Sequence, residues 1–378
     1  MKNYLKSVLL ILFLSVTFLA FGQNSDLIIT PQIKIPTDSI AKKYLIENLK
    51  IFIQDIENGN INSGVIAKVH LFKYKDYFDI FNNIQNSDKY GTRFFKPYLK
   101  NIVLQSDRSY KIDISYFGID DKNQILNRIN FSVIAKSENG NFNFYCPFEE
   151  NVKNWNYKKQ KKITFHFDDN FNKENALKFE KYNAEIAKKL NLSPIAFGYY
   201  KCKDIQEVYK LLGIDYFLQI NGDVRSSWIL DKGQIFISGT NLEEYNHDLT
   251  HLYFERKFGN EIRNWTAEEG YNIYTTDYWG RKPSEIFELL ENFIKENPDK
   301  SLYEVFQKNN ILQHPIRIKF PISAIFMRKL EREKGFDKVL ELICSGKTDD
   351  NYYKLLDKYL KVNKDNFDQI VKQELQKK

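Results

Sequence analysis

Cysteine is scarce in this chain, and its few positions exclude one class of small exported protein. The 378 residues include only three cysteines, Cys146, Cys202 and Cys344. Because they are odd in number and far apart, the chain is not a disulfide scaffold. One bridge between two of them could form, but the sequence does not select the pair. None of them has a second cysteine at the short spacing of a metal site.

Long apolar runs are missing outside the first residues of the chain. Residues 1–25 carry two lysines, then an apolar run at 8–21, then small and polar residues. This order is typical of a secretory signal peptide over 1–22, cleaved before Gln23. The run is shorter than the roughly 20 residues that span a membrane, which disfavours an uncleaved anchor. We therefore expect an exported protein, periplasmic or extracellular, without stable membrane insertion.

A concentrated basic surface is also absent from the sequence. The formal net charge is +7, but the basic residues are dispersed along the chain. The densest cluster, "KKQKK" at 158–162, is interpreted as part of a solvated linker over 150–162. A nucleic-acid-binding protein would need a basic stripe on a recognisable fold, so we expect no nucleic-acid partner.

Residues 23–155 are predicted to form a small α+β domain. Apolar residues at helical spacing predict a helix over 38–60. Apolar and polar residues alternate in four later segments, which predict an antiparallel sheet: 64–74, 109–119, 128–137 and 141–148. His70 falls in the first of these segments and is interpreted as a structural histidine. A helix followed by such a sheet resembles NTF2-like and cystatin-like domains in outline.

Residues 160–378 are predicted to form a second domain, so that the whole chain is of the α+β class. Its first half alternates predicted strands and helices, in the order 163–169, 172–192, 194–202, 204–214 and 232–239. From Pro283 onward the pattern is almost entirely helical. The second domain therefore has an α/β half followed by a helical half.

The junction of these two halves carries a pair of histidines. His247 and His251 lie four residues apart in "YNHDLTHLYFERKFG", which is predicted to be a helix. Thr240 could be its N-cap and Glu243 could close a capping box. Histidines at this spacing project from one side of a helix, so that both imidazoles can reach one metal ion. Such a pair is weak evidence when it stands alone.

A glutamate downstream could complete a metal site. The segment "RNWTAEEGYNIYTTDYWG" begins twelve residues after His251 and is predicted to be a second helix. If this helix folds back, it can supply a third ligand. Three protein ligands with an open fourth position form the arrangement of a catalytic zinc.

This segment resembles the Trp-x-x-Glu-Gly-x-x-x-Tyr segment of the gluzincin metallopeptidases, the thermolysin and aminopeptidase group of the MA clan. In that family the glutamate before the glycine binds zinc, which implies Glu269 here, with Tyr274 at the family's tyrosine position. Trp265 instead lies three residues before Glu268, which makes Glu268 the alternative ligand. Two anchors favour Glu269 and one favours Glu268.

The wider layout is similar to peptidase MA-like domains of exported bacterial proteins, over roughly residues 160–378. The resemblance implies a thermolysin-like domain that binds Zn²⁺ through His247, His251 and Glu269. It also implies a peptide or protein substrate, which we expect to pair with the strand at 233–239. A tyrosine or histidine should stabilise the transition state, but the sequence does not choose among Tyr271, Tyr274, Tyr278 and others.

Asp248 departs from the family pattern, because it gives HDxxH in place of HExxH. In the family this glutamate polarises the water on the zinc and passes its proton to the leaving amine. Aspartate is one methylene shorter, so its oxygens fall on the order of 1 Å short. Such a displacement can cost roughly 100-fold in rate. The resemblance thus implies either a weakened or adapted metallopeptidase with Asp248 as its base, or a catalytically inactive relative with a binding or structural role in the cell envelope.

Two further interpretations compete with the zinc peptidase. The His-Asp pair also resembles HD-type phosphohydrolases, but those need another upstream histidine within an all-helical domain. The nearest upstream histidine here, His166, lies on a predicted strand. The other interpretation is a structural envelope protein without any metal site.

Overall fold

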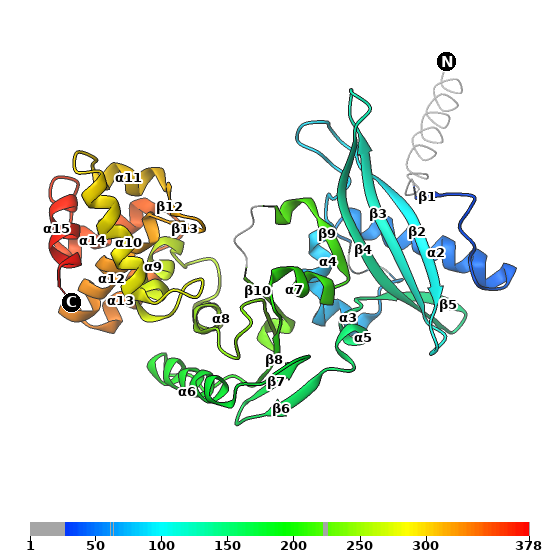
Figure 1. Ribbon diagram of the computed structural model, residues 1–378, viewed down its shortest axis with the longest axis horizontal. Coiled ribbons are helices and arrows are strands. Elements are labelled where there is room, and N and C mark those ends of the chain that lie inside the picture. The colour runs from blue at the N-terminus through cyan, green and yellow to red at the C-terminus, as the bar shows by residue number, and fades with distance from the viewer. Residues whose placement is uncertain (1–26, 61, 63, 222–225, 378) are drawn as a thin grey trace, which may run out of the picture. The chain divides into compact units, whose positions relative to one another are not determined.

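The computed structural model describes residues 27–60, 62, 64–221 and 226–377 (Figure 1). The expected signal peptide, residues 1–22, lies outside the described residues. None of the helices in the described part of the chain is both long and apolar enough to cross a membrane. The described chain divides into two compact units: the first holds residues 27–154, 209–221 and 230–232, and the second holds residues 155–208, 226–229 and 233–377.

The first unit contains a curved sheet with one long helix beside it. The helix α2 (Ser39–Glu57) is capped by Asp38 and buries Phe52, whose ring stacks on Phe144 at 4.7 Å. The sheet order is β1 (Ile28–Ile29), β2 (Lys96–Leu104), β3 (Tyr110–Ile119), β4 (Ile125–Glu138) and β5 (Asn141–Tyr145). Strands β2 to β5 pair antiparallel in sequence order, which confirms the predicted helix and the last three predicted strands.

The prediction of a strand over 64–74 is wrong. This segment contains the helix α3 (Lys68–Lys73), which is followed by α4 (Lys75–Phe78) and the 3₁₀ helix η1 (Asp79–Phe81). The buried residues are His70, Tyr74, Tyr77, Phe78 and Phe81. They recur every one to four residues along one face, so the helical period becomes visible only when the pattern is followed past Tyr74. His70 is thus a buried helical residue.

The segment 150–162, interpreted as a solvated linker, contains the boundary between the two units after residue 154, but it has regular structure of its own. The segment ends the helix α5 (Phe148–Val152) and then forms the strand β6 (Asn156–Lys159), which pairs antiparallel with β7 (Ile163–Phe167). All four side chains of β6 are exposed. A strand at the edge of a sheet with both faces in water shows no alternation of apolar residues, which is why the sequence did not reveal it.

The second unit begins with a five-stranded sheet in the order β10, β11, β8, β7, β6. The strands β7, β8 (Phe197–Lys201) and β11 (Ile235–Ser238) run parallel, and α6 (Lys173–Lys189) connects β7 to β8. This arrangement confirms the predicted α/β half. The helix α7 (Ile205–Leu211) follows β8, and the next strand, β9 (Ile214–Phe217), pairs with β4 in the sheet of the first unit.

The expectation that a peptide pairs with the strand at 233–239 is wrong. This strand, β11, lies between β8 and β10 (Ser227–Leu230), so both of its edges are hydrogen-bonded within the sheet. Among the described residues, the strands at the two edges of this sheet are β10 and β6. An added strand can pair only at an edge, where backbone N–H and C=O groups remain available.

The second half of this unit is helical, as predicted. Its helices surround one central helix, α12 (Lys319–Lys334). It packs against all the other helices of this half except α8. These helices are α9 (Trp265–Thr275), α10 (Pro283–Glu296), α11 (Leu302–Lys308), α13 (Phe336–Ile343), α14 (Asp349–Leu360) and α15 (Phe367–Leu375). A short hairpin of β12 (Ile311–Gln313) and β13 (Ile316–Arg317) precedes α12. The three cysteines are free.

Gly270 allows α9 to approach α12 closely. A Cβ atom added at Gly270 would lie 2.3 Å from the Ser323 hydroxyl oxygen and 2.8 Å from the Ser323 backbone carbon. Ser323 is fully buried, and its hydroxyl donates to the Thr266 carbonyl at 2.8 Å. The position of α9 therefore depends on the missing side chain at residue 270.

We expect Gly270→Ala to destabilise the second unit by about 1–3 kcal/mol, because the new methyl group meets backbone that cannot move aside. The measurement is the free energy of urea unfolding, followed by near-UV circular dichroism. Gly64→Ala is the matched control, because its added Cβ meets nothing within 4 Å. Equal stability of Gly270→Ala and wild type would contradict the close packing.

Candidate metal centre

The helix that carries the histidine pair is α8 (Asn246–Phe258), and it begins later than the sequence predicted. Its N-cap is Tyr245, which makes no side-chain capping bond, so the assignment of Thr240 as N-cap is wrong. Glu243 does not close a capping box. Its carboxylate accepts from the Asn172 N–H at 2.9 Å and pairs with the buried Lys201 ammonium at 3.2 Å. These contacts anchor the loop that leads into α8.

One face of α8 is fixed to α6 and its neighbouring loop. Leu249 and Tyr253 are fully buried, and the Ile195 N–H donates to the Tyr253 hydroxyl at 2.9 Å. Thr250 shares a hydrogen bond of 2.5 Å with the Tyr182 hydroxyl on α6. The helix is therefore held in place on the side away from the histidines.

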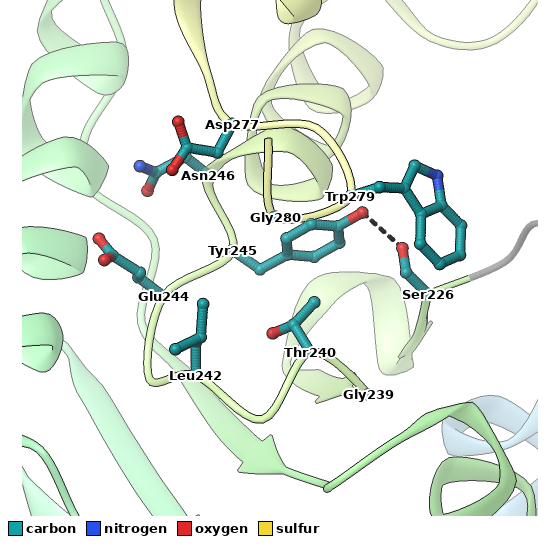
Figure 2. Close-up of a pocket in the computed structure, with 10 residues that line it drawn as sticks. All are labelled: Ser226, Gly239, Thr240, Leu242, Glu244, Tyr245, Asn246, Asp277, Trp279 and Gly280. Carbon is teal, nitrogen blue, oxygen red and sulfur yellow. Dashed lines mark hydrogen bonds between the residues drawn. The ribbon is translucent and has the colours of Figure 1, made fainter. Parts of the chain in front are cut away.

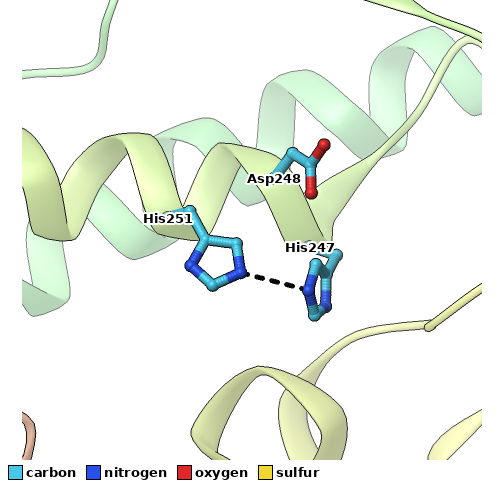
Figure 3. A group of neighbouring side chains, drawn as sticks. All are labelled: His247, Asp248 and His251. Carbon is cyan, nitrogen blue, oxygen red and sulfur yellow. Dashed lines mark hydrogen bonds between the residues drawn. The ribbon is translucent and has the colours of Figure 1, made fainter. Parts of the chain in front are cut away.

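The two histidines of α8 face each other, as their spacing predicted. The Nε2 atoms of His247 and His251 are 3.1 Å apart (Figure 3). His247 is 2% exposed. Asp248 lies on the neighbouring side of the helix, and each of the three residues offers a ligand atom within 4.8 Å of the others. This group could hold a metal ion.

The helix α9 brings Glu269 to the same point. One carboxylate oxygen of Glu269 lies 3.2 Å from His251 Nε2, and the other lies 3.4 Å from His247 Nε2. Glu269 is 4% exposed. The fold thus brings Glu269 to His247 and His251, although Glu269 follows them by 22 and 18 residues in the sequence.

Glu268 lies on the opposite side of the His251 ring. His251 Nδ1 donates to Glu268 Oε1 at 2.5 Å, and the Arg263 guanidinium donates to the same oxygen. Glu268 is fully buried. Because this carboxylate accepts the hydrogen bond of Nδ1–H, a neutral His251 directs the lone pair of Nε2 at Glu269 and His247. Glu268 therefore orients a histidine and does not share the point where the other three groups meet.

Sequence reasoning missed this role of Glu268, although a signal was present. Consecutive residues of a helix project about 100° apart, so Glu268 and Glu269 could not both face one ion. Trp265 also belongs to this side of the site, because its ring stacks on His251 at 4.9 Å with an angle of 11° between the planes. Together these contacts hold the His251 ring in one orientation.

The charges of neighbouring groups shift the pKa values of His251 and Glu269. Burial disfavours a charge on His251, but the carboxylates of Glu268 and Glu269 outweigh it and raise the pKa of His251 to about 10. Burial likewise opposes ionisation of Glu269, but His247 and His251 lower its pKa to about 2. The site thus favours positive charge between its carboxylates, and a metal cation and a proton compete for the same nitrogen.

Asp248 is held by the edge strand of the sheet. The Ser227 hydroxyl on β10 donates to Asp248 Oδ2. Asp248 is half-buried, whereas Ser227 is buried. The carboxylate is therefore fixed beside the histidines by a residue that the sequence did not single out.

Tyr278 is the tyrosine closest to the histidine pair among the three that the sequence offered. Its ring lies 4.7 Å from the ring of His247, and it is 7% exposed. Burial, reinforced by the charges of Glu269 and Asp248, raises the pKa of the Tyr278 hydroxyl far above its ordinary value. Tyr271 instead accepts from the Lys189 ammonium at 2.9 Å, and Tyr274 packs in the helical core.

The phosphohydrolase-type arrangement does not match the structure. His166 lies on β7 and stacks on Tyr200 at 4.3 Å, within a sheet and not in an all-helical domain. Neither a protein-family model nor a curated protein matches this chain. The chemistry of the site therefore has to be inferred from its own residues.

We expect Glu268→Gln to weaken metal binding about 10–100-fold, because a neutral amide orients and polarises His251 less well than a carboxylate. The measurement is a titration of the metal-free protein with zinc in competition with a chromophoric chelator. Glu255→Gln is the matched control, because Glu255 lies on the same helix as the histidines and is exposed. An unchanged affinity in Glu268→Gln would contradict the orienting role.

Proposed function

We propose that His247, His251 and Glu269 bind Zn²⁺ and that this chain is a metallopeptidase of the gluzincin type. The observation that carries the proposal is the convergence of three ligand groups, with separations of 3.1, 3.2 and 3.4 Å. A tetrahedral ion with bonds of about 2.0–2.1 Å keeps its ligand atoms about 3.3 Å apart. The three groups thus have the spacing that zinc requires.

The chemistry of these groups also suits zinc. Two imidazole nitrogens and one carboxylate form the ligand set of a catalytic zinc with an open position. Among the described residues, Glu269 Oε2 is buried without a hydrogen-bond partner, so a cation would satisfy it. Asp248 is the other candidate for the third ligand. Its ligand atom lies within 4.8 Å of those of the two histidines, and its carboxylate already accepts a hydrogen bond from Ser227. Glu269 therefore fits better than Asp248.

A zinc ion at this point would supply a Lewis acid that polarises a peptide carbonyl and acidifies a water molecule. Asp248 is then free to accept the proton of that water and to pass it to the leaving amine. Ser227 holds the carboxylate of Asp248 for this task. Tyr278 keeps its proton and can donate a hydrogen bond to the oxygen that becomes negative.

An extended peptide is the substrate that this arrangement favours. The edge strand β10 carries Ser227, the partner of Asp248, so a peptide that pairs with β10 would pass beside the base. We further propose that the protein acts after export, on the basis of the lysines and short apolar run of residues 1–22.

We expect the purified wild-type protein to contain about one equivalent of zinc, and both His247→Ala and Glu269→Gln to lose it, because each removes one of three ligands. The measurement is metal content by inductively coupled plasma mass spectrometry. His166→Ala is the control, because His166 stacks on Tyr200 away from the site. Wild-type protein without zinc, or a zinc content that survives both substitutions, would refute the proposed ligands.

A catalytically inactive binding protein with the same metal site is the second candidate. The shortened acid Asp248 favours it, because a base displaced by on the order of 1 Å loses much of its effect. The Ser227 hydroxyl also occupies one oxygen of this carboxylate. This second candidate has the same proposed zinc site, but its Asp248 does not transfer protons.

Variants at residue 248 distinguish the two candidates. If Asp248 is the base, Asp248→Asn should reduce kcat for a fluorogenic peptide about 100-fold or more while zinc remains bound. If the protein is inactive, Asp248→Glu should create hydrolysis where wild type has none. Ser227→Ala is a useful companion, because it frees the carboxylate without removing it. Equal hydrolysis by wild type and Asp248→Asn would exclude Asp248 as the base.

A further inference from the structure

A cavity of about 290 Å³ adjoins the proposed zinc site (Figure 2). Its lining comes from three segments, which are the residue before β10, the loop that leads into α8 and the turn after α9: Ser226, Gly239, Thr240, Leu242, Glu244, Tyr245, Asn246, Asp277, Trp279 and Gly280. A volume of this size suits one side chain or a short end of a peptide, because sites for larger ligands reach about 1,000 Å³.

One wall of the cavity lies beside the candidate metal centre. Tyr245 lines the cavity, and its ring lies 6.2 Å from the ring of His247. Tyr278, between the cavity residues Asp277 and Trp279, lies 4.7 Å from the same ring. A peptide that occupies the cavity would therefore place a neighbouring bond close to the histidine pair.

The charged groups that line the cavity are two carboxylates, Glu244 and Asp277, and none of its described lining residues is a lysine or an arginine. Figure 2 shows Glu244, Asn246 and Asp277 toward one end, and Trp279 with Ser226 toward the other. Among the described residues, neither Glu244 nor Asp277 forms an ion pair within 4.0 Å, and neither has a hydrogen bond. The cavity thus presents two carboxylates that no cation of the described chain neutralises.

The nearby lysines do not cancel this charge. Lys178 lies near Glu244 but pairs with Glu174 at 3.2 Å. Lys282 lies near Asp277, where Glu285 opposes its effect. Burial, reinforced by neighbouring carboxylates, raises the pKa of both Glu244 and Asp277. A positive ligand would relieve this repulsion, and the Tyr245 and Trp279 rings would cover its apolar stem.

We propose that this cavity binds a positively charged group of the substrate, so that the enzyme cleaves beside a lysine, an arginine or a free N-terminal amine. The proposal rests on the proposed peptidase function for its consequence, but the binding itself requires no catalysis. An ammonium or guanidinium group would lie between Glu244 and Asp277, with charge-assisted hydrogen bonds to both.

The first test measures binding to the full, metal-free protein by isothermal titration calorimetry. The ligands are acetyl-arginine amide, acetyl-norleucine amide and norleucine amide, which carry a charged side chain, no charge and a free amine. We expect one charged ligand to bind about 10–100-fold more tightly than acetyl-norleucine amide. The preferred charged ligand identifies the source of the charge. Equal affinity for all three ligands, or no binding of any, would overturn the proposal.

The matched variants remove two charges each. Glu244→Gln with Asp277→Asn should abolish the preference for the charged ligand. Glu255→Gln with Glu288→Gln removes two exposed carboxylates elsewhere in the same unit and should keep it. A preference that survives the first double variant would overturn the assignment of the cavity.

The second test measures kcat/KM of the zinc-loaded protein for fluorogenic peptides that differ only in arginine, norleucine or glutamate at one position. The cavity variant should lose about 10–100-fold on the arginine peptide while its rate on the norleucine peptide and its zinc content remain unchanged. Absence of zinc would refute the metal site alone, because the calorimetric result stands without it. Cleavage of all three peptides at equal rates would refute the cavity's role in specificity.

Discussion

Four ionisable side chains buried between α8 and α9 impose the constraint on which the rest of this site depends. His247, His251, Glu268 and Glu269 are all withdrawn from water, and a buried charge costs several kcal/mol unless it is paired. The two carboxylates contribute −2 and Arg263 contributes +1, which leaves −1 with neutral histidines. A proton on His251 restores neutrality, and a divalent cation overcompensates by one charge, which the Asp248 carboxylate beside the pair can offset. The site can therefore accept added positive charge, either as a proton on His251 or as a metal ion.

The structure around these helices keeps their separation fixed. Gly270 sets the approach of α9 to α12, and the Tyr253 hydroxyl ties α8 to the segment after α6. The Lys201–Glu243 pair, buried at both ends, anchors the loop before α8. Under the proposed function this support matters, because ligand atoms must hold their positions to within a few tenths of an ångström to bind a metal well.

Helices and strands could be predicted from the sequence wherever the spacing of apolar residues within the element itself shows its period. The helices after Pro283 and the parallel strands of the second unit each show their own period, and the histidine spacing placed two imidazoles on one side of a helix. The prediction failed where tertiary context decided the outcome. Strand β6 is exposed on both faces, so its sequence shows no alternation of apolar residues. The sequence of β11 does not reveal that β10 pairs with one of its edges. The loop before Asn246, where α8 starts, is anchored by partners of Glu243 that lie 71 and 42 residues earlier in the chain, Asn172 and Lys201.

The position of Asp248 at the start of α8 gives a second reason why this residue is an aspartate and not a glutamate. The helix has no side-chain cap, and Asp248 is the acidic residue of its first turn, where a negative charge stabilises the helix dipole. A short side chain stays near the helix end and within reach of the Ser227 hydroxyl, whereas a glutamate would extend past both. Asp248 thus serves the helix as well as the site. A protein that needs no proton transfer could keep Asp248 for this structural role alone. Under the proposed function, the position of the carboxylate beside two histidines and a tyrosine that retains its proton supports its role as an adapted base.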